Sequence, residues 1–181
     1  ISLAIRDNSF FKNAELLEAV AHARRNSTKV NLVGLAGEGS EHSAFEHLEA
    51  LMKMMEEENT PYALHLFTDG VDSSHQSAMR LLARLPQDKI GSVSGRRFAM
   101  DQDLHWDKTR ACYDALTSVS GSFASAGNLP AWLQAIYARG LTDDFVSPTA
   151  MSEELKIGKG DSPLSPGSAT AARSATTRVC W

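Results

Sequence analysis

Residues Ser92 to Trp106 read S-V-S-G-R-R-F-A-M-D-Q-D-L-H-W. They follow an apolar strand pattern and precede a helix pattern, so a polar loop joins a strand to a helix. In open α/β sheets, ligands bind at the carboxyl ends of the strands, where this loop lies. The adjacent Arg96 and Arg97 carry planar guanidinium groups that suit phosphate or carboxylate. The stretch therefore predicts a site for a small anion at one edge of an α/β sheet.

The rest of the chain alternates strand and helix patterns in the same way. Strand patterns cover 29–35, 62–68 and 90–94, and helical patterns cover 13–26, 44–58, 78–85, 106–116 and 129–138. Asn13 and Ser43 are expected to cap the first two of these helices. This alternation favours βαβ units. We therefore expect an α/β fold, a three-layer α/β/α domain with a mostly parallel sheet.

Three loops of this fold are expected to meet. Right-handed crossovers between parallel strands place the loops after them at one edge of the sheet. His42, Asp72 and Arg96 lie in these loops and could therefore face one cleft. Asp72 could serve as an acid or a base, and Asp69 fits the simpler role of a turn cap. His42 could bind an anion near a helix start or could be an ordinary surface histidine.

Composition excludes several classes of protein. The chain is 43% apolar and 22% charged, as in soluble globular domains, and has no run of about 18 apolar residues that would predict a membrane span. Its formal net charge of −4 argues against a nucleic-acid partner. Cys112 and Cys180 suggest neither a metal site nor a disulfide framework, and no signal-peptide pattern begins the sequence. We therefore expect a cytoplasmic protein. A zinc site built from His42, His75, Asp69 and Asp72 has no supporting ligand spacing.

The sequence changes character after Asp161. Residues 162–181 contain no Asp or Glu, and Ser, Ala, Thr and Pro dominate them. Such a segment lacks the apolar periodicity that packing requires. We therefore expect one domain over residues 1–161, followed by a tail over residues 162–181 that is disordered or out of frame.

Five blocks of the sequence resemble the cofactor-independent (2,3-bisphosphoglycerate-independent) phosphoglycerate mutases. The blocks are I-S-L-A-I-R-D-N-S-F-F-K-N, N-L-V-G-L-A-G-E-G-S-E-H-S, L-H-L-F-T-D-G-V-D-S, the stretch from Ser92 to Trp106, and L-T-D-D-F-V-S-P-T. The family typically shows D-G-G-V-H-S, F-x-D-G-R-D-T and S-G-R-Y-Y-A-M-D-R-D at the corresponding places. The resemblance covers residues 1–161 and is to the inserted substrate-binding domain of these enzymes.

This resemblance implies a function and its residues. Enzymes of the family interconvert 3-phosphoglycerate and 2-phosphoglycerate in glycolysis through a phosphoserine intermediate. A separate alkaline-phosphatase-like domain supplies the serine and holds two manganese ions. The resemblance does not extend to that domain, so it implies that this chain alone holds no metal and is inactive. By motif, His42 and Arg96 would bind the substrate, and Asp72 would contact it as the candidate acid or base.

Three positions depart from the family's pattern. Val71 and Gln102 stand where the family has the arginines of D-G-R-D and M-D-R-D. Each lost charged contact in a desolvated site could cost on the order of 1.5–3 kcal/mol. Arg97 replaces a tyrosine and could compensate in part as a substrate-binding residue. A second interpretation therefore stays open, a non-catalytic binding module for a small phosphorylated acid.

Overall fold

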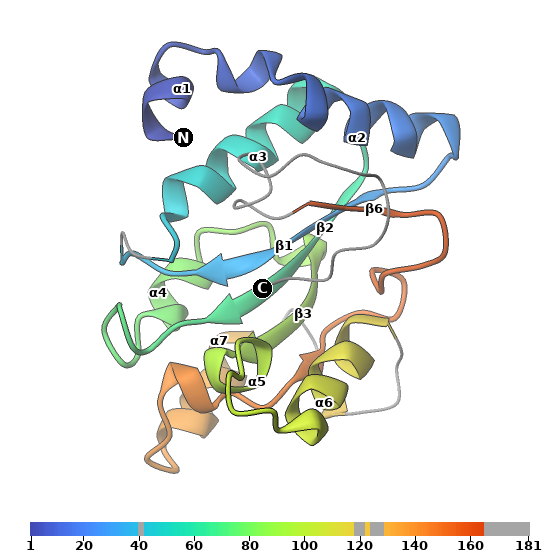
Figure 1. Cartoon of the computed structure of the whole chain (residues 1–181). Helices are drawn as coiled ribbons and strands as arrows, with labels where there is room; N and C mark the ends of the chain where they lie inside the picture. The colour runs from blue at the N-terminus through green and yellow to red at the C-terminus, as the bar shows by residue number, and fades with distance from the viewer. Residues whose placement is uncertain (40–41, 118–121, 124–128, 165–181) are drawn as a thin grey trace.

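The computed structural model describes residues 1–39, 42–117, 122–123 and 129–164 (Figure 1). Its middle layer is a six-stranded sheet in the order β4-β5-β3-β2-β1-β6. β1 pairs in parallel with β2 and β6, and β2 pairs in parallel with β3, whereas β5 runs antiparallel to β3. The predicted mostly parallel sheet is therefore confirmed. The strands are β1 (Val30–Ala36), β2 (Tyr62–Thr68), β3 (Ile90–Gly95), β4 (Ser122–Phe123), β5 (Thr149–Ala150) and β6 (Ser162–Leu164).

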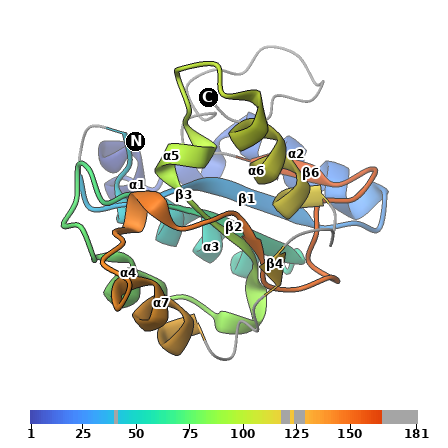
Figure 2. The ribbon, with the colours of Figure 1, turned by 90° about the horizontal axis from the view of Figure 1, so that it is seen from below.

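Helices cover both faces of the sheet, so the three-layer α/β/α arrangement is also confirmed. Side chains alternate along β1: Leu32 enters the larger apolar core with α2, α3, α4 and α7, while Val33 packs in a smaller cluster with α6. Figure 2 shows α3, α4 and α7 on one side of the sheet and α5 and α6 on the other. The helices are α1 (Ser2–Arg6), α2 (Ala14–Arg25), α3 (Phe45–Glu57), α4 (Ala78–Leu82), α5 (Arg96–Ala99), α6 (Trp106–Thr117) and α7 (Leu129–Tyr137).

The two predicted helix caps have different outcomes. The side chain of Asn13 accepts hydrogen bonds from the backbone N–H groups of Glu15 (3.0 Å) and Leu16 (3.2 Å), which confirms it as the cap of α2. The expected cap at Ser43 is wrong. α3 begins after Ala44 without a side-chain cap, because the Ser43 hydroxyl turns back toward Gly37 at the end of β1, where it leaves no room for a Cβ atom.

β6 changes where the expected tail begins. Residues Ser162–Leu164, assigned to the tail on composition, instead pair with Val30–Leu32 of β1. The backbone hydrogen bonds of an open strand edge stabilise this short strand without needing apolar periodicity. Residues 165–181 lie outside the described residues, so the division into a domain and a tail stays a prediction. Among the described helices, none is long and apolar enough to cross a membrane.

A row of hydrogen-bonded polar side chains crosses the sheet on the face of the smaller apolar cluster. The ring of His65 on β2 lies between Ser92 on β3 (Nδ1 to Oγ, 2.9 Å) and Asn31 on β1 (Nε2 to Oδ1, 3.2 Å). Asn31 in turn donates to Asp161, which also pairs with Lys29, both at 2.9 Å. Because Asp161 directly precedes β6, these contacts hold the sixth strand against the sheet.

Candidate anion-binding site

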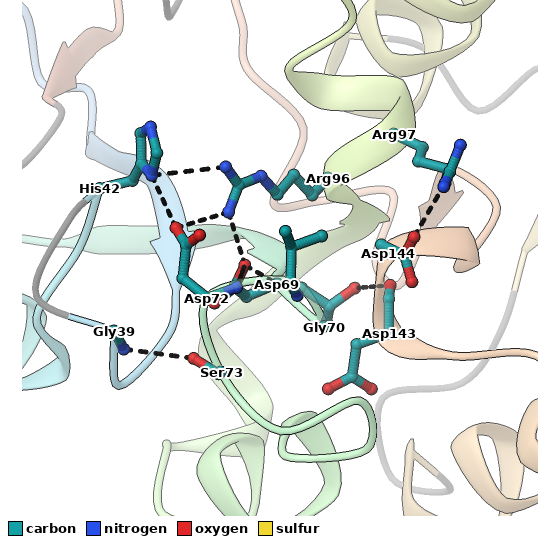
Figure 3. Close-up of polar contacts among 12 residues, drawn as sticks. Gly39, His42, Asp69, Gly70, Asp72, Ser73, Arg96, Arg97, Asp143 and Asp144 are labelled. Carbon is teal, nitrogen blue, oxygen red and sulfur yellow. Dashed lines mark hydrogen bonds and ion pairs between the residues drawn. The ribbon is translucent and has the colours of Figure 1, made fainter.

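The carboxyl ends of β1, β2 and β3 lie side by side and carry the loops that form the candidate site (Figure 3). His42 comes from the loop between β1 and α3. Asp69 and Asp72 follow β2, and Arg96 begins the short helix α5 directly after β3. The parallel order of the strands thus brings together side chains that are up to 54 residues apart in sequence.

His42, Asp72 and Arg96 form one hydrogen-bonded trio. Nδ1 of His42 lies 2.6 Å from Oδ2 of Asp72, and Nη1 of Arg96 donates to the same oxygen at 2.7 Å. Nη2 of Arg96 lies 3.4 Å from Nδ1 of His42, a long contact. The hydrogen bonds from Arg96 and from His42 lower the pKa of Asp72 below its usual value, so this carboxyl is ionised near neutral pH. The three residues chosen from sequence therefore lie together.

Asp69 lies beneath this trio and is almost fully buried, at 1% exposure. Its Oδ1 accepts hydrogen bonds from the backbone N–H groups of Val71 (3.4 Å) and Asp72 (3.2 Å), as a turn cap does. The same oxygen also accepts from Nη1 of Arg96 at 2.8 Å. Burial alone would raise the pKa of Asp69, but the hydrogen bonds that it accepts lower it below the usual value. The contact with Arg96 has no signal in the sequence, because 27 residues separate the pair.

The other three candidate residues lie apart from the trio or at its margin. Arg97 points away from the trio and donates from Nε to Asp144 at 2.8 Å (Figure 3). Its guanidinium lies 4.3 Å from the ring centre of Phe145. Val71 is next to Asp72 in the chain and is 58% exposed. Gln102 is exposed in the loop after α5, and no described residue of the trio accepts or donates a hydrogen bond to it. Arg97 is therefore adjacent to Arg96 in sequence, but its side chain contacts a different part of the structure.

The turn at Asp143 and Asp144 supports the loops of the site from behind, a role that the sequence did not indicate. A Cβ atom at Gly70 would lie 2.8 Å from the backbone nitrogen of Asp144, and one at Gly95 would lie 2.4 Å from its carbonyl oxygen. Gly70 also has a φ of +69°, which glycine adopts at little cost. Both glycines thus let this turn touch the ends of β2 and β3 directly. In the sequence, this block, L-T-D-D-F, stands out only through its resemblance to the family.

The trio does not suit a divalent metal ion. A guanidinium already donates to the oxygens of Asp69 and Asp72, and its positive charge would repel a cation at the same place. Nδ1 of His75 contacts the carbonyl oxygen of Gly70 at 2.8 Å, so this ring is engaged with the backbone. Elsewhere in the described residues, Asp101, Asp103 and His105 lie close enough to share an ion. However, Asp101 is already bound by His105 and by Lys108.

Comparison with known proteins identifies the family. The family model for the BPG-independent PGAM N-terminus matches residues 1–165. The 2,3-bisphosphoglycerate-independent phosphoglycerate mutase 2 of Methanosarcina barkeri is 36% identical over 162 residues, which are 85% of this chain and 31% of the relative. The corresponding enzyme of Yersinia pseudotuberculosis is 37% identical over 171 residues, covering 90% of this chain and 32% of the relative. The chain thus spans about a third of the length of these relatives.

The fold also matches a solved structure. Leishmania mexicana phosphoglycerate mutase, crystallised at low cobalt concentration, superposes with a TM-score of 0.75 at 19% sequence identity. The match covers 90% of this chain and 33% of that protein, and at this identity it speaks for the fold alone. Because the family model covers all of the described residues, the chain belongs to the 2,3-bisphosphoglycerate-independent phosphoglycerate mutase family, of which it represents the N-terminal region that the model defines.

Proposed function

We propose that this chain is the substrate-binding part of a phosphoglycerate mutase and that its trio binds 3-phosphoglycerate and 2-phosphoglycerate. The observation that carries the proposal is the meeting of His42, Asp72 and Arg96 at one edge of the sheet. A guanidinium recognises the carboxylate or phosphate of such a ligand, and an ionised carboxylate accepts a hydrogen bond from its hydroxyl group. Arg96 then clamps the anionic group, and Asp72 contacts the hydroxyl.

Asp72 is better suited to binding than to taking up a proton. A general base works best when its pKa lies near the working pH, and the contacts of Asp72 lower its pKa instead. The imidazole of His42 has one donor and one acceptor nitrogen, so His42 is the member of the trio suited to exchanging a proton with a bound hydroxyl. Asp72 therefore orients His42, and its predicted role as acid or base remains a proposal.

In this proposal, the metal ions of the reaction bind to another part of the longer family proteins. The family resemblance implies two manganese ions, and the trio does not suit them because the guanidinium of Arg96 already occupies the oxygens of Asp69 and Asp72. We place the manganese ions and the serine nucleophile in an alkaline-phosphatase-like domain of the longer family proteins. Val71 and Gln102 favour a second candidate function, the binding of a small phosphorylated acid without its conversion, because neither side chain supplies the charge of an arginine.

Calorimetric titration of the purified chain with 3-phosphoglycerate and 2-phosphoglycerate tests the proposal. We expect weak binding by the natural chain and no measurable binding by Arg96→Gln, because glutamine keeps polar atoms but loses the charge and the planar fork. Val71→Arg is expected to tighten binding on the order of tenfold, since a charged hydrogen bond contributes about 1.5–3 kcal/mol.

Arg97→Gln is the matched control, because this arginine pairs with Asp144 and lies outside the trio. It should bind as the natural chain does. Equal affinities of the natural chain and Arg96→Gln would contradict the proposal, as would a loss of binding in Arg97→Gln alone.

A further inference from the structure

Asp69 connects two of the three loops that carry the trio through a single oxygen atom. Its Oδ1 accepts from Nη1 of Arg96, at the start of α5, and from the backbone of Val71 and Asp72, after β2 (Figure 3). The direction in which Arg96 points and the path of the backbone at Asp72 are therefore set by the same atom. A residue that only capped its own turn would contact the backbone after β2 and not Arg96.

Asp69 is also the innermost partner of Arg96. The side chain of Asp69 is 1% exposed, whereas those of Asp72 and His42 are 21% and 41% exposed. Within the described residues, these three supply the polar contacts of the guanidinium. The two outer partners are the groups that a ligand would contact or displace. The contact with Asp69 is the one that can persist when a ligand arrives.

The geometry leaves one side of the guanidinium for a ligand. Nη1 donates to both carboxylates at 2.7 and 2.8 Å, while Nη2 has one long contact of 3.4 Å, to His42. Arginine binds carboxylate or phosphate best when its planar fork is already oriented, since less conformational freedom is then lost on binding. Holding Nη1 from below presents Nη2 outward.

We propose that Asp69 is a positioning residue, which fixes the Arg96 guanidinium relative to Asp72 so that Nη2 meets the incoming anion in a preset orientation. This proposal rests on the proposed function for the identity of the ligand. The positioning of Arg96 is a property of the chain without ligand and can be measured separately.

The sign of the effect separates positioning from simple electrostatics. Asp69 is negative, so removing its charge would strengthen binding of an anion if only the net charge of the site mattered. Positioning predicts the opposite result, weaker binding. Asp69→Asn is the sharpest variant, because the amide oxygen can still accept from the backbone of Val71 and Asp72 and so retain the turn, while the ion pair with Arg96 is reduced to a weaker hydrogen bond to a neutral oxygen.

Two measurements on the complete chain test the proposal. The first is the ¹⁵N relaxation and proton exchange of the Arg96 Nε–H group, assigned by its loss in Arg96→Gln. The second is calorimetric titration with 3-phosphoglycerate. In Asp69→Asn we expect faster motion and faster exchange at Arg96, together with an affinity for 3-phosphoglycerate that is lower on the order of tenfold.

Asp161→Asn is the matched control. Asp161 is also a buried carboxylate that pairs with a cation, Lys29, and accepts a backbone hydrogen bond, from Gly158, but it lies before β6 and away from the trio. This variant should lose stability without changing either measurement at Arg96. It therefore separates a general loss of packing from a loss of positioning.

Each outcome decides one question. Unchanged motion of Arg96 in Asp69→Asn overturns the positioning role, and so does an affinity equal to or higher than that of the natural chain. If the natural chain binds no 3-phosphoglycerate, the proposed function fails, and the motion of Arg96 alone still decides whether Asp69 positions it. Should Asp69→Asn unfold, Asp69→Glu keeps the charge and lengthens the side chain, and the proposal then requires a changed Arg96 signal with a lower affinity.

Discussion

The ring of His65 is buried in the row of polar side chains on the face of the sheet with the smaller apolar cluster. It contacts Ser92 and Asn31 at 2.9 and 3.2 Å, and burial lowers its pKa from 6.5 to about 4. In the unfolded chain the ring regains its ordinary pKa. Between these two values, the unfolded chain binds a proton that the folded chain does not, so the free energy of unfolding decreases as the pH falls.

We expect this single residue to weaken the fold in mild acid. The loss begins below about pH 6.5 and reaches about 3 kcal/mol near pH 4, because each pKa unit corresponds to about 1.4 kcal/mol. Urea unfolding at pH 7 and at pH 4.5 measures it. His65→Gln removes the titrating ring and should flatten this pH dependence, although it costs stability at pH 7. His22→Gln, at a histidine on α2 outside this row of polar side chains, should leave the slope unchanged, and an unaltered slope in His65→Gln would contradict the expectation.

At this same scale, the sequence predicts the chemical type of the site residues better than their contacts. Arg96 and His42 could be chosen because their residue types suit an anion, and Asp72 because a carboxylate can act as an acid or a base. The loops of all three share one edge of the sheet. The hydrogen bond between Asp69 and Arg96 could not, since it depends on side-chain directions that no local pattern encodes. Arg97 illustrates the limit: it neighbours Arg96 in sequence, but the turn of α5 directs it to Asp144.

The junction between β3 and the turn at Asp144 is tight at the level of the elements. Gly95 ends β3 and donates its N–H to the carbonyl oxygen of Val146 at 2.6 Å, and a Cβ atom here would lie 2.4 Å from the carbonyl oxygen of Asp144. When an added Cβ atom would lie within 3.0 Å of a backbone atom, the backbone has to shift. The next residue is Arg96, so any shift at this junction also moves the guanidinium.

We therefore expect Gly95→Ala to lower the free energy of unfolding by about 1–3 kcal/mol, as overpacking does in protein cores. Binding of 3-phosphoglycerate should weaken as well, because Arg96 moves with the backbone. Gly158→Ala serves as control, since the nearest atom to its added Cβ would be 3.7 Å away. Urea unfolding and calorimetry measure both effects. If the two alanine variants were equally stable, the contact at Gly95 would not be tight in solution.

The sequence predicts long elements of this fold and misses short ones. The strand pattern at 62–68 matches β2 at both ends, and the helical pattern at 13–26 contains α2. Such segments span several repeats of the hydrophobic period, which is the signal that identifies them. β5 and β6 have two and three residues, too few for any period, and they form because a neighbouring strand offers unpaired backbone groups.

As a whole molecule, the described residues form a closed α/β unit with cores on both faces of the sheet. β6 returns the chain to the edge of β1, and the contacts of Asp161 with Lys29 and Asn31 fasten it there. The strands that carry the site loops, β1, β2 and β3, therefore all belong to this one sheet.

We expect a polypeptide of these 181 residues to bind 3-phosphoglycerate without converting it to 2-phosphoglycerate. Transfer of a phosphoryl group needs a nucleophile and positive charge on the transferring oxygens. The trio offers one guanidinium, which is already paired with the two carboxylates of Asp69 and Asp72, and no place for a divalent ion beside it. Phosphorus NMR of 3-phosphoglycerate incubated with the chain and manganese measures this directly, with a full-length family enzyme as the positive control.

Restoring charge with Val71→Arg and Gln102→Arg should tighten binding and still give no 2-phosphoglycerate. Product that forms in proportion to the chain and is lost in Arg96→Gln would show that this edge of the sheet catalyses the reaction itself.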